Sequence, residues 1–240
     1  MTLSVTVWNE GIHEQENEET QEIYPDGIGE TMAAFFAEAG YETRVVRMQD
    51  PEHGLTEQVL AETDVLVWWG HAAHDDVDDD IADRVVEAVW DGMGYIALHS
   101  SHHAKPFMRL VGTDCDEKFR VAEERQRIWV TDPGHPIANG LPEAIVIPES
   151  EMYGEPHNIP QPEATVFISW FEGGEVFRSG CCWRRQRGRI FYFAPGHETY
   201  PIFHHDQVQQ ILVNAVEWAQ PVQGAVDVTY RHSPDPPEPL

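Results

Sequence analysis

The chain has 240 residues, of which 41% are hydrophobic, and its 42 acidic side chains outnumber the 15 basic ones to give a formal net charge of −27. This length and apolar content are sufficient for the core of one α/β domain. The negative charge repels nucleic acid and anionic membranes, so neither is an expected partner. An acid-rich surface with only two lysines, Lys105 and Lys118, is typical of a protein that stays soluble in a very salty cytosol.

The first hundred residues alternate between short apolar runs and amphipathic segments. We expect strands at residues 3–8, 43–48, 64–69 and 95–98. Helices are expected between them, at residues 32–39, 55–62 and 78–90. Residues 9–22 are polar and form a loop long enough to carry function. The alternation predicts an α/β fold with a doubly wound, mostly parallel sheet.

The segment from residue 111 to residue 180 loses this alternation. Short strands interrupted by Pro and Gly are expected at residues 127–131, 144–148 and 165–170, which predicts an inserted irregular or antiparallel segment. Regular structure returns with a strand at 189–193 and a helix at 206–219. We therefore expect a single domain over residues 1–222 and a Pro- and Asp-rich tail over residues 223–240.

Neither a membrane anchor nor a disulfide framework is expected. The longest apolar runs are shorter than the about 18 residues of a membrane span, and the N-terminus lacks the pattern of a signal peptide. Three cysteines, Cys115, Cys181 and Cys182, are odd in number and match no zinc-binding spacing, so reduced structural thiols are expected. These observations predict a cytoplasmic protein.

Three of the apolar runs end in histidine, namely His71, His99 and His197. Because parallel sheets bind ligands beyond the carboxyl ends of their strands, we expect the three imidazoles to converge on one crevice. The alternative is that each histidine is satisfied separately at its own strand end. The same edge is expected to carry further polar or aromatic side chains, which are Asn9, Glu10, His13, Trp69, His74, Glu151, Tyr153, Glu155 and Glu198.

Two kinds of chemistry fit these residues, alone or combined. In the first, His71, His99 and His197 bind a divalent metal, zinc or manganese, with Glu155 as a carboxylate ligand. In the second, a histidine beside a carboxylate, such as His197 beside Glu198, moves a proton from a carbon next to a carbonyl group. A serine nucleophile is a weaker third interpretation, because His99 and not Ser100 stands at the apex of the strand–helix turn. No glycine-rich dinucleotide motif follows a strand, so no nucleotide cofactor is expected.

Seven motifs occur in an order that resembles the ThuA family of trehalose utilisation proteins. The resemblance runs from about residue 3 to residue 220. The motifs are Trp-Asn-Glu at residues 8–10, Tyr-Pro-Asp-Gly-Ile at 24–28, Trp-Trp-Gly-His at 68–71 with His74, Leu-His-Ser at 98–100, Glu-Met-Tyr-Gly-Glu at 151–155, Gly-Glu-Val-Phe-Arg-Ser-Gly at 174–180 and Pro-Gly-His-Glu-Thr-Tyr-Pro at 195–201.

The resemblance implies a class I glutamine amidotransferase-like fold of the flavodoxin-like type. It also implies a role in disaccharide catabolism, in which partner oxidoreductases act on trehalose-like sugars. Amidotransferases of this class carry a nucleophilic cysteine where this chain has His99, so glutamine hydrolysis through a thiolate is not expected. Gly29 stands where the family has a histidine, which removes one candidate ligand or base.

Together these observations predict an isomerase or hydrolase that acts on a keto-sugar or disaccharide derivative, with or without a metal ion. The alternative is a non-catalytic sugar-binding or regulatory subunit of a carbohydrate-catabolic pathway. Expected partners are a small carbohydrate, a pathway oxidoreductase and further copies of the chain in a homo-oligomer. The expected catalytic residues are His99, His197, Glu198 and Glu10, and the expected substrate-binding residues are Asn9, His13, Trp69, His74, Tyr153 and Glu151.

Overall fold

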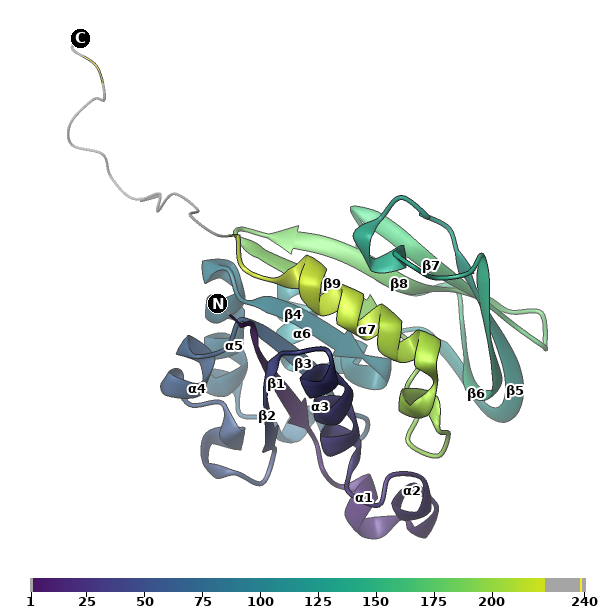
Figure 1. The fold of residues 1–240 in the computed structure, drawn as a ribbon, viewed down its shortest axis with the longest axis horizontal. Coiled ribbons are helices and arrows are strands. Elements are labelled where there is room, and N and C mark those ends of the chain that lie inside the picture. The colour runs from purple at the N-terminus through teal and green to yellow at the C-terminus, as the bar shows by residue number, and fades with distance from the viewer. Residues whose placement is uncertain (1, 223–237, 239–240) are drawn as a thin grey trace.

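The computed structural model describes residues 2–222 and Glu238, and the chain is organised around one nine-stranded sheet (Figure 1). The strand order is β2-β1-β3-β4-β9-β8-β7-β5-β6. The five strands from β2 to β9 run parallel to their neighbours, and the remaining four continue the sheet in antiparallel pairs. The parallel part has the flavodoxin-like strand order, which confirms the predicted fold class. The predicted tail over residues 223–240 lies outside the described residues, apart from Glu238.

The parallel strands fall within one residue of their predicted bounds. They are β1 (Ser4–Asn9), β2 (Glu42–Arg47), β3 (Val65–Trp69), β4 (Gly94–Leu98) and β9 (Gly188–Phe193). Every residue of β3 and β4 is buried. Helices cover both faces of a parallel sheet, which explains why its central strands are apolar without alternation.

Helices lie on both faces of the parallel strands, as Figure 1 shows. On one face lie α3 (Ile28–Glu38) and α7 (Asp206–Ala219), which share a hydrophobic cluster with the sheet. On the other face, a second cluster includes α4 (Glu57–Ala61), α5 (Asp79–Asp91) and α6 (Lys105–Val111). The predicted helices are confirmed, while α6 was not predicted.

The polar segment after β1 was predicted to be a loop, but it is not a continuous loop. It contains α1 (His13–Glu16) and α2 (Glu18–Ile23). The Asn17 side chain caps α2 by accepting hydrogen bonds from the backbone N–H groups of Glu19 and Thr20. Only Thr20 of these helices is buried, so hydrophobic periodicity gave no signal for them.

The insertion between α6 and β9 consists of longer strands than predicted. They are β5 (Lys118–Val130), β6 (Ala144–Gly154), β7 (Ala164–Phe171) and β8 (Val176–Arg185). The antiparallel character is confirmed, but β8 was missed. Its sequence carries Ser-Gly near the centre and two arginines at the end, and its pairing with both β7 and β9 overrides this weak local preference.

Irregular pairing bends β5 and β6 over the parallel part of the sheet. The register shifts between Arg120 and Glu124 and again between Glu124 and Gln126. Such bulges bend a strand and increase its twist. The end of β6 consequently reaches the carboxyl edge of the parallel strands, where the Tyr153 ring stacks on His99. The insertion thus adds a wall to that edge.

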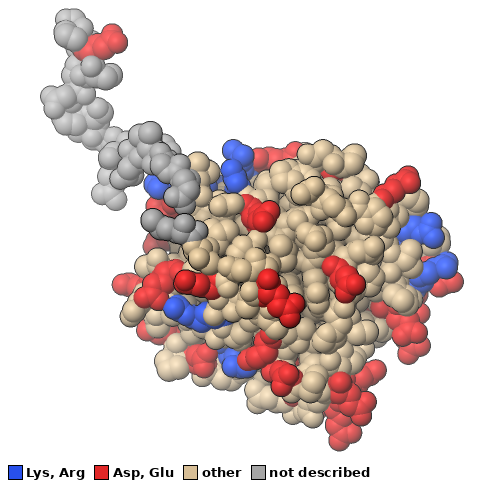
Figure 2. Space-filling view, in the orientation of Figure 1, with Lys and Arg blue, Asp and Glu red and all other residues tan. Residues whose placement is uncertain are grey.

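Acidic side chains are scattered over the face of the molecule shown in Figure 2, where Lys and Arg are fewer. On the exposed side of α5, Asp83, Glu87 and Asp91 follow one another at four-residue spacing. Like charges at this spacing repel one another on a helix. Among the described residues, the helices are all too short or too polar to span a bilayer.

We predict that salt stabilises this protein. Raising potassium chloride from 0.1 to 2 M screens the repulsion among surface carboxylates, and each 1 kcal/mol gained raises Tm by about 2–4 °C in a domain of this size. Differential scanning calorimetry measures the change. The variant Glu87→Gln, which removes one repelling charge from α5, should gain less from salt than the parent chain. A Tm that stays constant or falls with salt would contradict this prediction.

Candidate functional site

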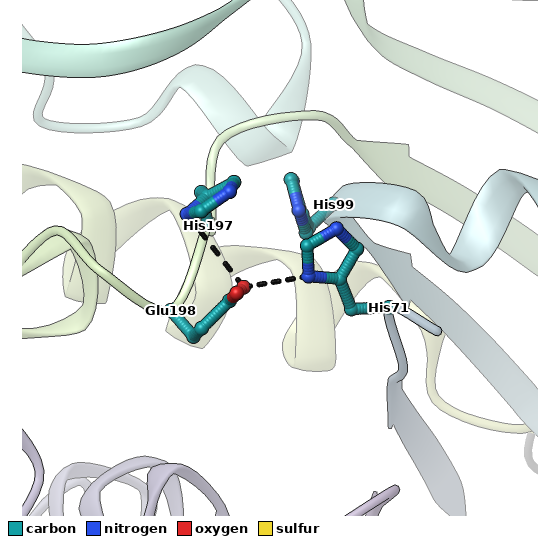
Figure 3. A group of neighbouring side chains, drawn as sticks. All are labelled: His71, His99, His197 and Glu198. Atoms are coloured by element: carbon teal, nitrogen blue, oxygen red, sulfur yellow. Dashed lines mark hydrogen bonds and ion pairs between the residues drawn. The ribbon is translucent and has the colours of Figure 1, made fainter. Parts of the chain in front are cut away.

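Four side chains converge at the carboxyl edge of the parallel strands: His71, His99, His197 and Glu198 (Figure 3). Their potential ligand atoms all lie within 4.8 Å of one another. The centroids of the three imidazole rings are separated by 5.0–5.3 Å. His71 follows β3, His99 follows β4, and the other two follow β9. The convergence predicted from the strand ends is therefore confirmed.

His99 stands at the apex of the turn between β4 and the short 3-10 helix η3 (His99–His103). Its φ of 55° is in the left-handed region, which non-glycine residues adopt uncommonly. The turn is crowded by the loop after β9. A Cβ atom on Gly196, whose φ is 153°, would lie 3.1 Å from the Cβ of His99, so only glycine fits there.

No thiol joins this cluster among the residues that the structure describes. Cys115, Cys181 and Cys182 are free and buried. Burial raises the pKa of Cys115 to about 11 and that of Cys181 to about 12, so both remain protonated near neutral pH. The apex of the turn therefore presents an imidazole, and the thiols are structural.

Glu198 connects the histidines of the cluster. Its Oε2 lies 2.8 Å from Nδ1 of His71 and 3.6 Å from Nδ1 of His197, and its Oε1 lies 3.4 Å from Nδ1 of His13 (Figure 3). Burial acts to raise the pKa of Glu198, but the hydrogen bond from His71 and the adjacent imidazoles outweigh it and hold that pKa at about 2. The carboxylate is consequently ionised near neutral pH.

The imidazoles differ in how readily they take up a proton. Burial lowers the pKa of His197 to about 4 and that of His99 well below its ordinary value, so both are neutral near pH 7. Burial also opposes protonation of His71, but the hydrogen bond to Glu198 and the nearby carboxylates raise its pKa. Neutral imidazoles and an ionised carboxylate are the forms that bind metal ions. Glu198 can complete the ligand set or orient His71 for it.

Two side chains from β6 form the wall beside His99. The Tyr153 hydroxyl lies 3.2 Å from Nδ1 of His99 and 2.9 Å from the Ser100 hydroxyl. Oε2 of Glu151 lies 3.7 Å from Nε2 of His99 and has no hydrogen-bond partner among the described residues. Burial raises the pKa of Glu151 to about 7, so its carboxyl group can hold or release a proton near neutral pH.

His13 lies at the solvent side of the cluster. Its ring stacks on His71 with a centroid distance of 4.9 Å. The side chains of His13 and His71 are 21% and 25% exposed, whereas those of His99 and His197 are 2% and 7% exposed. The side of the cluster that faces solvent is therefore formed by His13 and His71.

Glu10 was predicted to be a catalytic residue, but its carboxylate contacts the backbone of the loop after β3. It is buried, and its Oε2 accepts hydrogen bonds of 2.9–3.0 Å from the backbone N–H groups of His71, Ala72 and Ala73. Three consecutive N–H donors form a cradle for an anion. The carboxylate of Glu10 thus holds the loop that carries His71, and we assign it a positioning role.

Trp69 and Asn9 also shape the edge without facing the cluster. Trp69 is fully buried, and its indole N–H donates a 2.9 Å hydrogen bond to the carbonyl of Gly196, which ties the loop after β9 to β3. The Asn9 amide donates to Glu14 and its oxygen accepts from the backbone N–H of Gly11, which fixes the turn after β1. Both were predicted to contact substrate, and the structure instead places them in the scaffold.

The structure does not bring Glu155, the predicted carboxylate ligand, together with the three histidines. Glu155 forms a two-pronged ion pair with Arg178, with distances of 2.8 and 3.0 Å, and accepts the backbone N–H of His157. Burial opposes ionisation, but Arg178 lowers the pKa of Glu155 below its ordinary value. The carboxylate in the cluster is Glu198, the sequence neighbour of His197.

Another set of residues lies beyond the cluster and was not predicted as a site. It contains His102, His103 and Glu117, and the predicted substrate ligand His74 lies against it, with its ring 6.2 Å from that of His103. The His-Ser-Ser-His-His run at residues 99–103 was a visible signal for the two histidines. Glu117 had none, because it follows an irregular turn in a chain rich in acidic residues.

The sheet order defines the fold class, which is the class I glutamine amidotransferase-like α/β fold. Three solved structures have this fold. A protein described as ThuA-like from Parabacteroides merdae ATCC 43184 has a TM-score of 0.66 and 13% identity, with 94% of this chain and 93% of that chain covered. A second one from Bacteroides uniformis ATCC 8492 has a TM-score of 0.62 and 17% identity, with 90% of each chain covered. A chain of PurLQS from Thermotoga maritima has a TM-score of 0.58 and 12% identity, with coverage of 91% and 99%.

The family model ThuA, described as trehalose utilisation, matches residues 4–219. This chain therefore belongs to the ThuA family. No curated protein matches the sequence.

We predict that Glu10→Gln destabilises the protein, because the amide replaces one accepting oxygen by a donor that faces backbone N–H groups. A loss on the order of 2–3 kcal/mol in the free energy of unfolding is expected, measured by urea denaturation. Glu16→Gln, on the exposed side of α1, is the matched control and should change stability by less than about 0.5 kcal/mol. Equal losses in the two variants would show that the cradle contributes nothing.

Proposed function

We propose that this ThuA family protein is a metal-assisted enzyme that acts on a keto-sugar or disaccharide derivative by proton transfer or hydrolysis. The observation that supports this most directly is the convergence of His71, His99, His197 and Glu198 at the carboxyl edge of the sheet, next to Glu151. The family description, trehalose utilisation, suggests a trehalose-like disaccharide as the source of the substrate.

The donor set of the cluster suits a divalent ion. Three imidazole nitrogens and one carboxylate oxygen are ligands that zinc and manganese accept. If only three of the four side chains bind the ion, a coordination position is left for substrate or water. When bound, such an ion would polarise a sugar carbonyl or activate a water molecule. The burial of His99 and His197 keeps water away from the inner side, while His71 leaves the outer side open.

Glu151 is the proposed proton carrier. Its carboxyl oxygen is buried beside His99 and has no hydrogen-bond partner among the described residues, so it is free to accept a proton from the substrate. A carbonyl group acidifies the neighbouring C–H bond of a keto-sugar, and general base catalysis removes such a proton. Tyr153 fixes the His99 ring by stacking and by its hydroxyl group, and His13 is placed to bind a sugar hydroxyl at the mouth.

The proposal also implies what precedes the reaction. A keto-sugar is formed when an oxidoreductase transfers a hydride from a sugar carbon to an oxidised cofactor while the hydroxyl group on that carbon loses its proton. The pathway partner that we propose is therefore an oxidoreductase that acts on the same disaccharide in the cytoplasm. The alternative, a sugar-binding or regulatory subunit, predicts affinity for the sugar without turnover.

Removal of divalent ions should abolish most of the activity. We expect dialysis against EDTA to lower kcat on keto-trehalose at least tenfold, with recovery on addition of one equivalent of zinc or manganese, because the polarising charge is lost and regained. Turnover is followed by chromatography of the sugar products, and metal content by elemental analysis. Activity that survives complete removal of the metal would exclude the metal-assisted mechanism.

Substitutions in the cluster separate catalysis from binding. His197→Ala and His99→Asn should each lower kcat/KM at least about 10²-fold, and asparagine is chosen because it tolerates the left-handed conformation at residue 99. Glu151→Gln should lower kcat by about 10²–10⁴ while metal content stays unchanged. His135→Ala, which changes a histidine next to Trp218 and away from the cluster, is the matched control. Sugar binding by the parent chain without any turnover would favour the non-catalytic subunit.

A further inference from the structure

The cluster of His102, His103 and Glu117 forms a compact group outside the proposed active site. Nε2 of His102 lies 2.6 Å from Oε2 of Glu117, and Nε2 of His103 lies 3.9 Å from the same oxygen. The potential ligand atoms of the three residues are all within 4.8 Å of one another. Two of them belong to η3, and Glu117 directly precedes β5. Nothing in the proposed reaction uses these groups.

Several buried polar atoms in and around this group have no hydrogen-bond partner in the part of the chain that the structure describes. The side chains of His102 and Glu117 are 1% and 4% exposed, and among the described residues neither Nε2 of His102 nor Oε2 of Glu117 has a hydrogen-bond partner. The two atoms are close enough for an ion pair but are not aligned for a hydrogen bond. Both ring nitrogens of the adjacent His157 are also buried and unpartnered, as is Nε2 of His74.

We infer that His102, His103 and Glu117 form a second divalent-metal site. Buried polar atoms in folded proteins are normally satisfied, and a cation would satisfy the ring nitrogens and the carboxylate oxygen at once. Two imidazoles with one carboxylate are ligands that zinc accepts. Asp116, whose Oδ1 lies 3.8 Å from Nε2 of His103, is in reach as a further ligand.

The site has an entrance from solvent. The side chains of His103 and Asp116 are 38% and 79% exposed, whereas the other two ligands are buried beneath them. Asp114 is a second exposed carboxylate on the same turn, where it accepts the backbone N–H of Asp116. Carboxylates at the mouth raise the local concentration of cations. An ion would therefore enter past Asp116 and His103 and be held by Glu117 and His102.

Tyr153 separates this site from the proposed active site. The Tyr153 ring contacts one histidine of each group: His99 stacks on it at 5.5 Å, and His102 meets it edge-on at 5.6 Å. Two-metal catalytic centres hold their ions about 3.5–4 Å apart through shared ligands, which an intervening aromatic ring prevents. The second site therefore has a structural role. It joins η3 to the start of the antiparallel insertion and so fixes the turn that presents His99.

Metal stoichiometry tests this inference directly. After equilibration with zinc chloride and removal of unbound ions, elemental analysis should find two zinc ions per chain. His103→Ala and Glu117→Gln should each retain one, and His71→Ala should also retain one, because it affects only the first site. His135→Ala is the control and should retain two. Since Glu117 is buried and its variant could fail to fold, the half-exposed His103 provides the decisive substitution, and circular dichroism verifies the fold of each protein.

The outcomes separate this inference from the proposed function. Two zinc ions in the parent chain and one in His103→Ala support the second site. One zinc ion that is lost in His71→Ala but kept in His103→Ala overturns the second site and leaves the metal of the proposed function in place. One zinc ion that is lost only in His103→Ala supports the second site and removes the metal from the proposed function. An absence of bound zinc in the parent chain, or two ions retained in His103→Ala, overturns the inference.

Discussion

The arrangement of the site depends on a buried carboxylate, Glu10, that accepts hydrogen bonds from three consecutive backbone N–H groups. These bonds fix the loop after β3 and hence the position of His71. The loop after β9 is fixed in a similar way, because the Trp69 indole donates to the carbonyl of Gly196 beside His197. The loops that carry His71 and His197 are therefore each held by a side chain at the end of another parallel strand, Glu10 after β1 and Trp69 in β3.

The buried ionisable groups can lie this close together because their charges do not repel one another. Glu198 is ionised and bound to His71, while burial keeps His99 and His197 neutral. The antiparallel insertion supplies the remaining wall, since β6 bends back to place Glu151 and Tyr153 against His99. The parallel strands thus position the imidazoles, and the insertion covers one side of the cluster and adds a carboxyl group.

Much of the fold could be predicted from the sequence because buried parallel strands are continuous apolar runs, and their topology forces the carboxyl ends to one edge. This reasoning located the three histidines without any knowledge of distances.

The same reasoning did not place Glu155, because its ion pair with Arg178 joins two segments of the insertion, and the sequence carries no signal that these segments meet. It also gave Glu10 a catalytic role, since a carboxylate at a strand end has the same sequence pattern whether it faces a ligand or a backbone loop. The helices α1 and α2 and the strand β8 were missed because capping and sheet pairing determine them more than hydrophobic periodicity does.

The proposed function requires His71, His99, His197 and Glu198 to hold a divalent ion at the edge of the sheet. X-ray diffraction from crystals grown with zinc chloride, measured on both sides of the zinc absorption edge, can locate such an ion. We expect an anomalous difference peak enclosed by these four side chains, about 2.0–2.2 Å from the coordinating nitrogen and oxygen atoms. An ordered cluster without such a peak, with Glu198 still hydrogen-bonded to His71 in its present geometry, would exclude this metal site.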